Sequence, residues 1–253
     1  MAVKIHPMLC GVLETDAAGI MAKQPGRLRL PIPSYLIVHP RGTAVFDTGL
    51  HSDLQKNSDR LGPLGKMFQV FFRPGEELGA RLRAHDVEPA RVDYLINSHL
   101  HFDHVGGNQD LPNAKLVVQR LEWEAAANPE LIRKNGYNRK DFDLGHKLLL
   151  VDGEHDLFGD GSVTLIPTYG HTAGHQSLRV RNDRGEVVMT ADSCYMRQAL
   201  EEMVLPPFAH SYDAMREVIM RYRAMERAGA RLIFGHDAAQ WNEKQATLTQ
   251  PLQ

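Results

Sequence analysis

The chain has 253 residues, of which 43% are hydrophobic and 24% are charged, and its formal net charge is −2. These values are typical of a globular protein with a substantial core, and we expect a single domain over residues 1–253. A near-neutral chain lacks the basic surface of a nucleic-acid binder. We find no apolar stretch of transmembrane length and no signal-peptide core at the N-terminus. We therefore predict a cytoplasmic protein without nucleic-acid or membrane partners.

The first predicted elements are two strands joined by a tight turn over residues 34–47, where β-branched and aromatic residues flank Pro-Arg-Gly. Residues 48–75 are rich in glycine and proline, and we expect them to be irregular. Acidic residues in a first turn favour a helix over residues 76–85. A short apolar strand over residues 92–97 then leads directly into a group of histidines.

The rest of the chain alternates predicted strands and helices. Strands are expected over residues 115–118, 148–151, 163–166 and 232–234, a hairpin turn at 159–161, a second strand–turn–strand unit at 177–190, and helices at 121–128 and 211–228. Residues 129–147 are polar and give no clear pattern.

The two strand–turn–strand units resemble each other. Residues 34–49 align with residues 177–192 without gaps, and an Arg-Gly pair falls in the turn of both. The repeat indicates either a duplicated architecture or a chance likeness between two hairpins with the same turn, and both interpretations stay open.

Histidine is the unusual residue, with 13 copies, and it is the commonest metal ligand in proteins. His99 and His101 lie two apart at a predicted strand end, so both imidazoles can point toward one ion. Asp103 and His104 follow where the chain can bend, because Gly106-Gly107 favours a tight turn, and they can face a second ion. A chance histidine-rich turn is the weaker explanation for four ligand-type residues within six positions.

Three more candidate ligands follow predicted strands further along the chain. His171, Asp192 and His236 each stand near the carboxyl end of a β-segment, and such ends line one edge of an α/β protein, where sites assemble. Singly, each would be an ordinary polar loop residue. Together with the histidine run, they predict one metal site.

This pattern resembles the metallo-β-lactamase superfamily from Ser34 to Asp237. The resemblance implies an α/β fold, an αβ/βα four-layer sandwich in which two mixed sheets are flanked by helices and the metals lie at one edge. It also implies two Zn²⁺ per chain, although other divalent metals suit such ligands. The implied ligands are His99, His101 and His171 for the first ion and Asp103, His104 and His236 for the second, with Asp192 and a hydroxide bridging the two.

Within this superfamily the sequence is most similar to the N-acyl homoserine lactone lactonases. The similarity rests on the segments Phe46-Asp47-Thr48-Gly49, Ala191-Asp192-Ser193-Cys194-Tyr195 and Phe234-Gly235-His236-Asp237. It implies a hydrolase of carboxylic esters that opens lactone rings by attack of the bridging hydroxide. Tyr195 would stabilise the lactone oxygen and Asp103 would pass a proton to the leaving alkoxide. A homodimer is expected from the resemblance alone.

Other activities remain as alternatives. A lactonase for γ-butyrolactone or a pyridoxolactone-type ring would need the same metal site and a different pocket. A thioester hydrolase of the glyoxalase II type is less favoured, because the sequence after Asp237 is short for its extra helical domain. A di-iron redox protein would replace one histidine by a carboxylate and add a flavin domain, and neither feature is found.

Several residues near the predicted site have a plainer interpretation. We expect Asp47 and His175 either to support a ligand histidine or to be ordinary loop residues, and we expect Cys194 to be a small buried residue. The candidates for an acyl-chain groove are Met21, Phe68, Phe71 and Phe72. For the cluster from Phe68 to Phe72, packing in the core or at a dimer contact is slightly preferred. The remaining histidines are interpreted as surface or structural: His6, His39, His51, His85, His146, His155 and His210.

Overall fold

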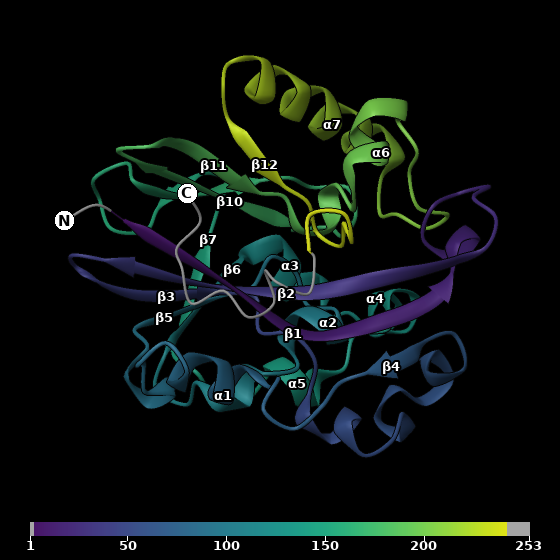
Figure 1. Cartoon of the computed structure of the whole chain (residues 1–253), viewed down its shortest axis with the longest axis horizontal. Coiled ribbons are helices and arrows are strands. Elements are labelled where there is room, and N and C mark those ends of the chain that lie inside the picture. Colours follow the sequence, from purple (N-terminus) through teal and green to yellow (C-terminus); the bar gives the residue numbers. More distant parts are fainter. Residues whose placement is uncertain (1–2, 242–253) are drawn as a thin grey trace.

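The computed structural model describes residues 3–241 and consists of two sheets packed face to face between layers of helices (Figure 1). The seven-stranded sheet has the order β4 (Gln69–Phe71), β1 (Lys4–Asp16), β2 (Arg27–His39), β3 (Gly42–Phe46), β5 (Tyr94–Ile96), β6 (Lys115–Gln119) and β7 (Leu148–Val151). The five-stranded sheet has the order β12 (Arg231–Ile233), β11 (Gly185–Met189), β10 (Gln176–Asn182), β9 (Val163–Pro167) and β8 (His155–Asp156). The predicted α/β sandwich is confirmed.

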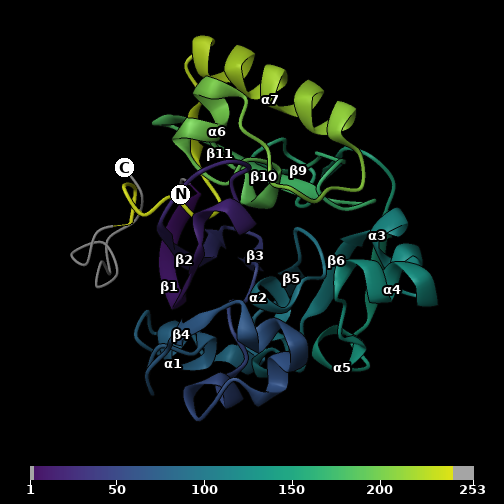
Figure 2. The same cartoon turned by 90° about the vertical axis from the view of Figure 1, so that its right-hand side faces the viewer.

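Helices cover the outer face of each sheet. They are α1 (Leu78–Arg83), α2 (Phe102–Val105), α3 (Arg120–Ala125), α4 (Pro129–Asn135), α5 (Arg139–Phe142), α6 (Arg197–Glu202) and α7 (Tyr212–Arg227). In Figure 1, α6 and α7 lie above the five-stranded sheet, and α1 and α5 lie below the seven-stranded sheet. Figure 2 shows α3 and α4 gathered beside β6.

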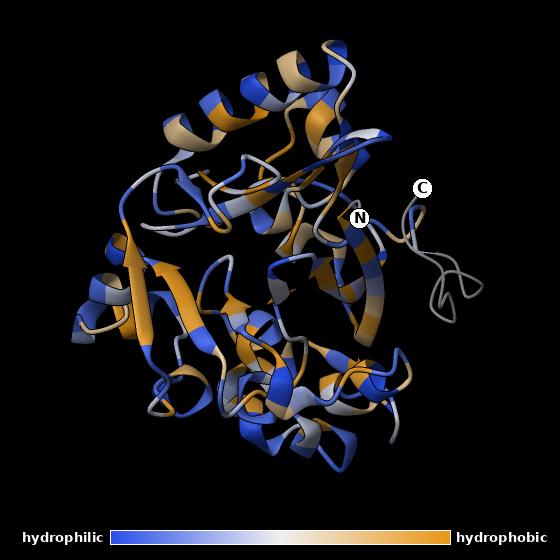
Figure 3. Ribbon diagram, turned by 90° about the vertical axis from the view of Figure 1, so that its left-hand side faces the viewer, coloured by the Kyte–Doolittle hydropathy of each residue, from blue (hydrophilic) through white to orange (hydrophobic). Residues whose placement is uncertain are grey.

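Strand alternation builds the core on both faces of the larger sheet. Tyr35 and Ile37 of β2 point between the two sheets, whereas Leu36 points to the other face and packs with Leu78 of α1. This is the two-residue period of a strand that is covered on both sides. In Figure 3 the strands of the interior are largely apolar, whereas α7 alternates polar and apolar residues, as a helix with one exposed face does.

Both sheets are mixed, and parallel pairing sets where the carboxyl ends of the strands meet. β3, β5, β6 and β7 pair in parallel, as do β11 and β12. The hairpins β2–β3 and β10–β11 hold corresponding places, because each sends its second strand into a parallel pair, with β5 and β12 respectively. The sequence repeat therefore coincides with a repeat in topology.

The N-terminal part of the larger sheet was missing from the prediction. β1 pairs antiparallel with nearly the whole of β2, from Arg27 to Val38, with an irregularity between Leu9 and Val12. Neither β1 nor the first half of β2 was predicted. Pro7, Pro31 and Pro33 disguise these strands, because proline cannot donate a ladder hydrogen bond and argues against a strand in the sequence. Residues 129–147, which had no pattern, form α4 and α5.

The other elements lie close to their predicted positions, with shifted ends. The helices expected at 76–85 and 121–128 are shorter, as α1 and α3. Residues 48–75 contain 3-10 turns, including Asp59–Lys66, and the short edge strand β4. Among residues 3–241, no helix has the length and apolar character required to cross a membrane.

Candidate metal centre

All seven predicted ligands meet at one edge of the sandwich. His99 and His101 follow β5, and Asp103 and His104 lie in the short helix α2. The other three, His171, Asp192 and His236, lie in the β9–β10 loop, the turn after β11 and the segment after β12. The carboxyl ends of the strands therefore bring together residues that are up to 137 positions apart in the sequence, from 99 to 236.

The first group consists of His99, His101, His171 and Asp192, whose ligand atoms all lie within 4.8 Å of one another. His101 Nδ1 lies 2.9 Å from His99 Nε2 and 3.1 Å from His171 Nε2. Asp192 Oδ2 lies 3.4 Å from His171 Nε2 and 3.8 Å from His99 Nε2. Three imidazole nitrogens and one carboxylate oxygen are a donor set that suits zinc and related divalent metals.

The second group consists of Asp103, His104 and His236. Asp103 Oδ2 lies 3.7 Å from His104 Nε2 and 3.8 Å from His236 Nε2. Asp192 also faces this group, with its other oxygen, because Oδ1 lies 3.1 Å from His104 Nε2 and 2.9 Å from His236 Nε2. One aspartate thus presents Oδ2 to the first group and Oδ1 to the second.

Most donor atoms of the cluster are buried, and two of them lack a hydrogen-bond partner in the described part of the chain, as is expected of metal ligands. The side chains of His99, His104, His171, Asp192 and His236 are each at most 5% exposed. His104 Nε2 and Asp192 Oδ1 are buried without a hydrogen-bond partner among the described residues. Buried polar atoms are normally satisfied, and a cation between the two groups would satisfy both. The residues present therefore fit a metal.

The pKa values of the histidines differ between the two groups, because carboxylates outweigh the effect of burial only in the second. Burial lowers the pKa of His99 and His171 well below the usual range and that of His101 to about 4, which keeps these rings neutral and able to coordinate. At His104, burial lowers the pKa, but the surrounding Asp192, Asp103 and Asp47 outweigh it and raise the pKa well above its usual range. Metal binding at the second group would therefore displace a proton.

Hydrogen bonds behind the ligands fix which nitrogen faces the cluster. Asp47 Oδ2 lies 2.8 Å from His104 Nδ1, and the carbonyl oxygen of Pro31 lies 2.8 Å from His236 Nδ1. Because carboxylates and carbonyls only accept, both Nδ1 atoms donate, and Nε2 is the atom turned to the cluster. The supporting role expected for Asp47 agrees with this geometry.

The backbone around the site is under conformational constraint. Asp47 and Ala191, which are not glycines, have φ values of 56° and 47°, and such strained residues cluster at functional sites. Gly235, next to His236, leaves no room for a side chain, since a Cβ there would lie 2.5 Å from the Ala191 carbonyl oxygen. Close packing of these turns holds Asp192 against His236.

A cavity of about 870 Å³ opens onto the cluster and is lined by His101, Asp103, His171, Asp192 and His236. Its walls are mostly apolar and come from four parts of the chain, represented by Ile20, Leu64, Ile132 and Phe208. Tyr195 also lines it, with its hydroxyl 3.4 Å from His171 Nδ1. Burial, reinforced by Asp192 and Asp103, raises the pKa of Tyr195 well above its usual range, so this hydroxyl stays protonated and can donate a hydrogen bond.

Of the four residues proposed for the acyl groove, only Phe68 lines this cavity. Met21 is 1% exposed and Phe72 is 6% exposed, and both belong to the core. Phe71 points outward, with the guanidinium of Arg29 5.0 Å from its ring. Neighbouring residues of an edge strand face opposite sides, so a run of aromatic residues cannot line one wall. For Phe72, the preferred interpretation as core is confirmed.

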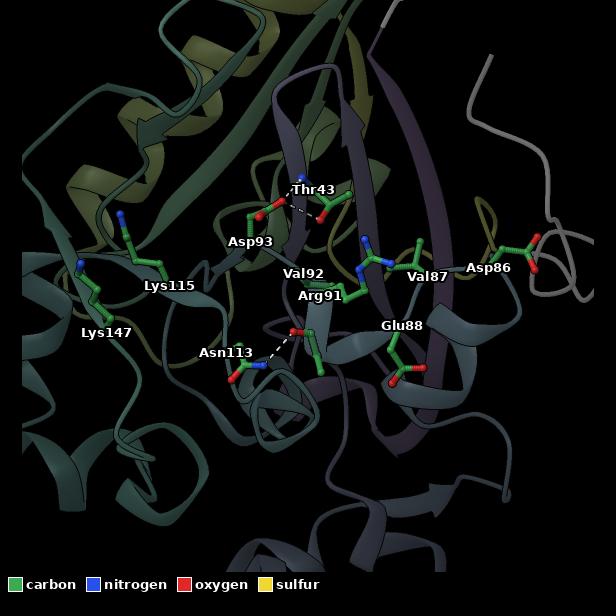
Figure 4. Close-up of a pocket in the computed structure, with 11 residues that line it drawn as sticks. Thr43, Asp86, Val87, Glu88, Arg91, Val92, Asp93, Asn113, Lys115 and Lys147 are labelled. Carbon is green, nitrogen blue, oxygen red and sulfur yellow. Dashed lines mark hydrogen bonds between the residues drawn. The ribbon is translucent and has the colours of Figure 1, made fainter.

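A second hollow, shown in Figure 4, lies at the opposite ends of the strands. Its lining includes Thr43, Asp93, Lys115 and Lys147, at or just before the beginnings of β3, β5, β6 and β7. The Asp93 carboxylate already accepts hydrogen bonds from the Thr43 backbone N–H, at 2.8 Å, and from its hydroxyl, at 3.2 Å. Ligands of α/β sheets bind at the carboxyl ends, so we place the functional site at the His–Asp cluster.

Within residues 3–241, the groups able to hold a metal include none of His6, His39, His51, His85, His146, His155 and His210. His175 is buried behind His99, with ring centroids 5.1 Å apart, and contacts Thr168 Oγ1 through Nδ1 at 2.8 Å. Cys194 is buried and 1% exposed, in line with a small core residue.

Two residues of the site region were missed by the sequence reasoning. Glu122 of α3 is a buried carboxylate that accepts hydrogen bonds from the loops of both His99 and His171. Tyr137, which lines the cavity, donates its hydroxyl to Glu122 at 2.8 Å. A glutamate at the start of a short helix is usually exposed, and Tyr137 falls in the segment without a pattern, so no local signal marked either residue.

The fold and this cluster define the protein as an α/β sandwich with a histidine–aspartate site able to hold metal ions. A family model for the metallo-beta-lactamase superfamily matches residues 27–236. The N-acyl homoserine lactonase AttM of Azorhizobium caulinodans is 37% identical over 251 residues, which cover 94% of this chain and 95% of that protein. The N-acyl homoserine lactonase AiiA of Bacillus thuringiensis subsp. kurstaki is 31% identical over 232 residues, with 87% and 86% covered.

Comparison with solved structures also finds similarity to N-acyl homoserine lactone hydrolases. An N-acyl homoserine lactone hydrolase with the product N-hexanoyl-L-homoserine bound at its catalytic metal center superposes with a TM-score of 0.84 at 28% identity, covering 95% of this chain and 96% of that one. The chain therefore belongs to the metallo-beta-lactamase superfamily and, within it, to the N-acyl homoserine lactonase family.

Proposed function

We propose that this chain is a metal-dependent hydrolase that opens the ring of N-acyl homoserine lactones and thereby destroys quorum-sensing signals. The observation that carries the proposal is that seven His and Asp side chains converge at one cavity, which five of them line beside mostly apolar walls. The family relatives bear the name of this activity. The His–Asp cluster is suited to ester hydrolysis, and the apolar lining of the cavity is suited to binding an acyl chain.

Two ions, most simply zinc, would occupy the two groups. His99, His101 and His171 would hold the first and Asp103, His104 and His236 the second, with Asp192 shared between them. Bound divalent ions supply a coordinated water of lowered pKa and polarise a carbonyl oxygen. The wild-type protein should then contain about two metal ions per chain.

Two residues of the chain, Tyr195 and Asp103, take part in the remaining steps of hydrolysis. The Tyr195 hydroxyl, held protonated in the cavity, donates a hydrogen bond to the lactone carbonyl oxygen as negative charge develops there. Water adds its oxygen to the carbonyl carbon and the ring C–O bond breaks. Asp103 lines the cavity and carries the proton from the attacking water to the departing ring oxygen. The product is the ring-opened N-acyl homoserine.

The cavity walls favour an acylated lactone over the alternatives. Leu64, Phe68 and Ile132 line the approach to the cluster, and a small ring such as γ-butyrolactone would leave this apolar surface unused. Each methylene of an acyl tail that is buried against these walls contributes about 0.8 kcal/mol of binding free energy. Substrates with longer acyl chains should therefore bind more tightly. A pyridoxolactone or a glutathione thioester would offer polar groups to the same surface.

A substrate panel tests the assignment. Initial rates should be compared for butanoyl-, hexanoyl- and decanoyl-homoserine lactone, γ-butyrolactone, pyridoxolactone and a glutathione thioester. We expect kcat/KM to be highest for the acyl homoserine lactones, and Asp192→Asn to abolish their hydrolysis. Faster turnover of the thioester or of a non-acylated lactone would refute the assigned substrate, and full activity of Asp192→Asn would refute the metal mechanism.

Three expectations from the sequence stay predictions of this proposal. The chain should behave as a single domain over residues 1–253, which one cooperative unfolding transition would support. It should form a homodimer, to be measured by light scattering. It should reside in the cytoplasm, to be tested by cell fractionation.

A further inference from the structure

Among the residues that the structure describes, Glu122 is a buried carboxylate without a cationic partner. It is 0% exposed, at the first turn of α3. Its Oε1 accepts hydrogen bonds from the Leu100 backbone N–H, at 3.1 Å, and from the Tyr137 hydroxyl, at 2.8 Å. Its Oε2 accepts one from the Gly174 backbone N–H, at 2.9 Å. Burying a carboxylate is costly unless donors satisfy it, so these three contacts are what allow Glu122 to occupy this position.

Two of the three donors belong to segments that carry ligands of the first group, and the third packs beside one of those ligands. Leu100 stands between His99 and His101 in the sequence, and Gly174 lies three residues after His171. The Tyr137 ring lies beside the His101 ring, with centroids 5.5 Å apart. Glu122 therefore connects all three histidines of the first group through their backbones or a neighbouring ring.

The contact with the His171 loop depends on close approach. A Cβ at Gly174 would lie 2.1 Å from the Glu122 backbone nitrogen, so the loop can reach α3 only because this residue is glycine. The carboxylate and the glycine together hold the β9–β10 loop against the helix. The position of His171 relative to His99 thus depends on this contact.

The second group has a different support. His104 is held by Asp47 and His236 by the Pro31 carbonyl oxygen, both at 2.8 Å. Neither contact involves α3. Asp47 also accepts the Ser98 backbone N–H and hydroxyl next to His99, so it touches both groups. Glu122 instead contacts only the segments around the first group.

We propose that Glu122 is a positioning residue for the first metal position alone, fixing the backbones of Leu100 and Gly174 so that His99, His101 and His171 converge. The inference rests on the metal centre of the proposed function. A residue with only a general structural role would weaken both metal positions alike, through the stability of the whole fold. A loss of zinc affinity at one position only therefore distinguishes a positioning role from a general structural role.

The test is a zinc titration of Glu122→Gln, with Glu124→Gln as the matched control, since Glu124 is exposed on the same helix. Glutamine preserves the volume, but its amide N–H₂ must face a donor, either the Gly174 N–H or the Leu100 N–H. Each protein is loaded with two equivalents of zinc and titrated with a competing chelator. We expect Glu122→Gln to release one equivalent about 10-fold more readily than wild type, with the second equivalent and the control unchanged.

If Glu122→Gln binds both zinc equivalents equally more weakly than wild type, or retains both as tightly as wild type, the proposal is overturned. A wild-type chain that binds no zinc would instead refute the metal centre itself, so the two failures are distinguishable. Should Glu122→Gln fail to fold, amide hydrogen exchange of the wild-type protein provides the test. The Leu100 and Gly174 amides should exchange slowly, and exchange as fast as that of exposed loop amides would also overturn the proposal.

Discussion

Replacing Asp47 by asparagine should disable the second metal position without disturbing the fold. Asp47 has φ of 56°, a left-handed conformation that asparagine adopts more readily than most residues. Its Oδ1 accepts the Ser98 backbone N–H at 2.7 Å, which an amide oxygen can also do. The amide nitrogen then takes the place of Oδ2, which lies 2.8 Å from both the Ser98 hydroxyl and His104 Nδ1.

This exchange reverses the tautomer of His104. A carboxylate accepts from Nδ1–H, whereas an amide N–H₂ donates to Nδ1 and moves the ring proton to Nε2. Nε2 is the atom that lies 3.1 Å from Asp192 Oδ1, so coordination there is blocked. One hydrogen bond to a charged group is worth about 1.5–3 kcal/mol, which corresponds to about a 10- to 100-fold loss of metal affinity at 1.4 kcal/mol per factor of ten.

The assay is chelator competition on zinc-loaded protein, with the unfolding midpoint of the metal-free protein measured in parallel. Asp213→Asn is the control, because the Asp213 side chain is 93% exposed and belongs to neither ligand group. We expect Asp47→Asn to lose one zinc equivalent selectively while its metal-free unfolding midpoint stays near that of wild type. Zinc affinity within twofold of wild type at both positions would refute the tautomer argument.

Three further predictions follow from the cavity and the buried histidines. Tyr195→Phe should lower kcat by about 10²-fold, as loss of an oxyanion donor does, while zinc content stays at the wild-type value; an unchanged kcat would remove Tyr195 from the mechanism. Phe68→Ala should raise KM for the decanoyl substrate by about tenfold and leave butanoyl kinetics unchanged; equal effects on both would place Phe68 outside the acyl groove. Burial lowers the pKa of His101 to about 4 and of His175 to about 3 from 6.5, so both take up protons on unfolding, and the metal-free protein should lose stability as the pH falls below 6.5. A urea midpoint that does not decrease between pH 6.5 and about 4.5 would contradict this last prediction.

The residues of the His–Asp cluster could be predicted because their signals are local. His99, His101, Asp103 and His104 fall within six residues, and His171, Asp192 and His236 each follow a strand. Each signal depends only on strand ends and residue type. The long-range geometry that joins them, including the two oxygens of Asp192, comes from the parallel pairing that brings the strand ends together.

Features that depend on tertiary packing were not predictable in the same way. Glu122 is indistinguishable in sequence from a surface acid of a helix, and its donors lie 15, 22 and 52 residues away. The faces of Phe68, Phe71 and Phe72 are set by an edge strand and a turn that the sequence did not indicate. β1 was hidden because Pro7 and Gly11 interrupt its pattern, although pairing with β2 supplies what local propensity lacks.

The most direct test of the proposed activity is metal removal and restoration, with hydrolysis of N-hexanoyl homoserine lactone as the readout. Dialysis against a chelator should abolish ring opening, and two equivalents of zinc per chain should restore it. The account predicts that activity returns in proportion to metal bound at the cluster. Ring opening that persists in metal-free protein, or its absence in protein that holds two zinc ions, would contradict it.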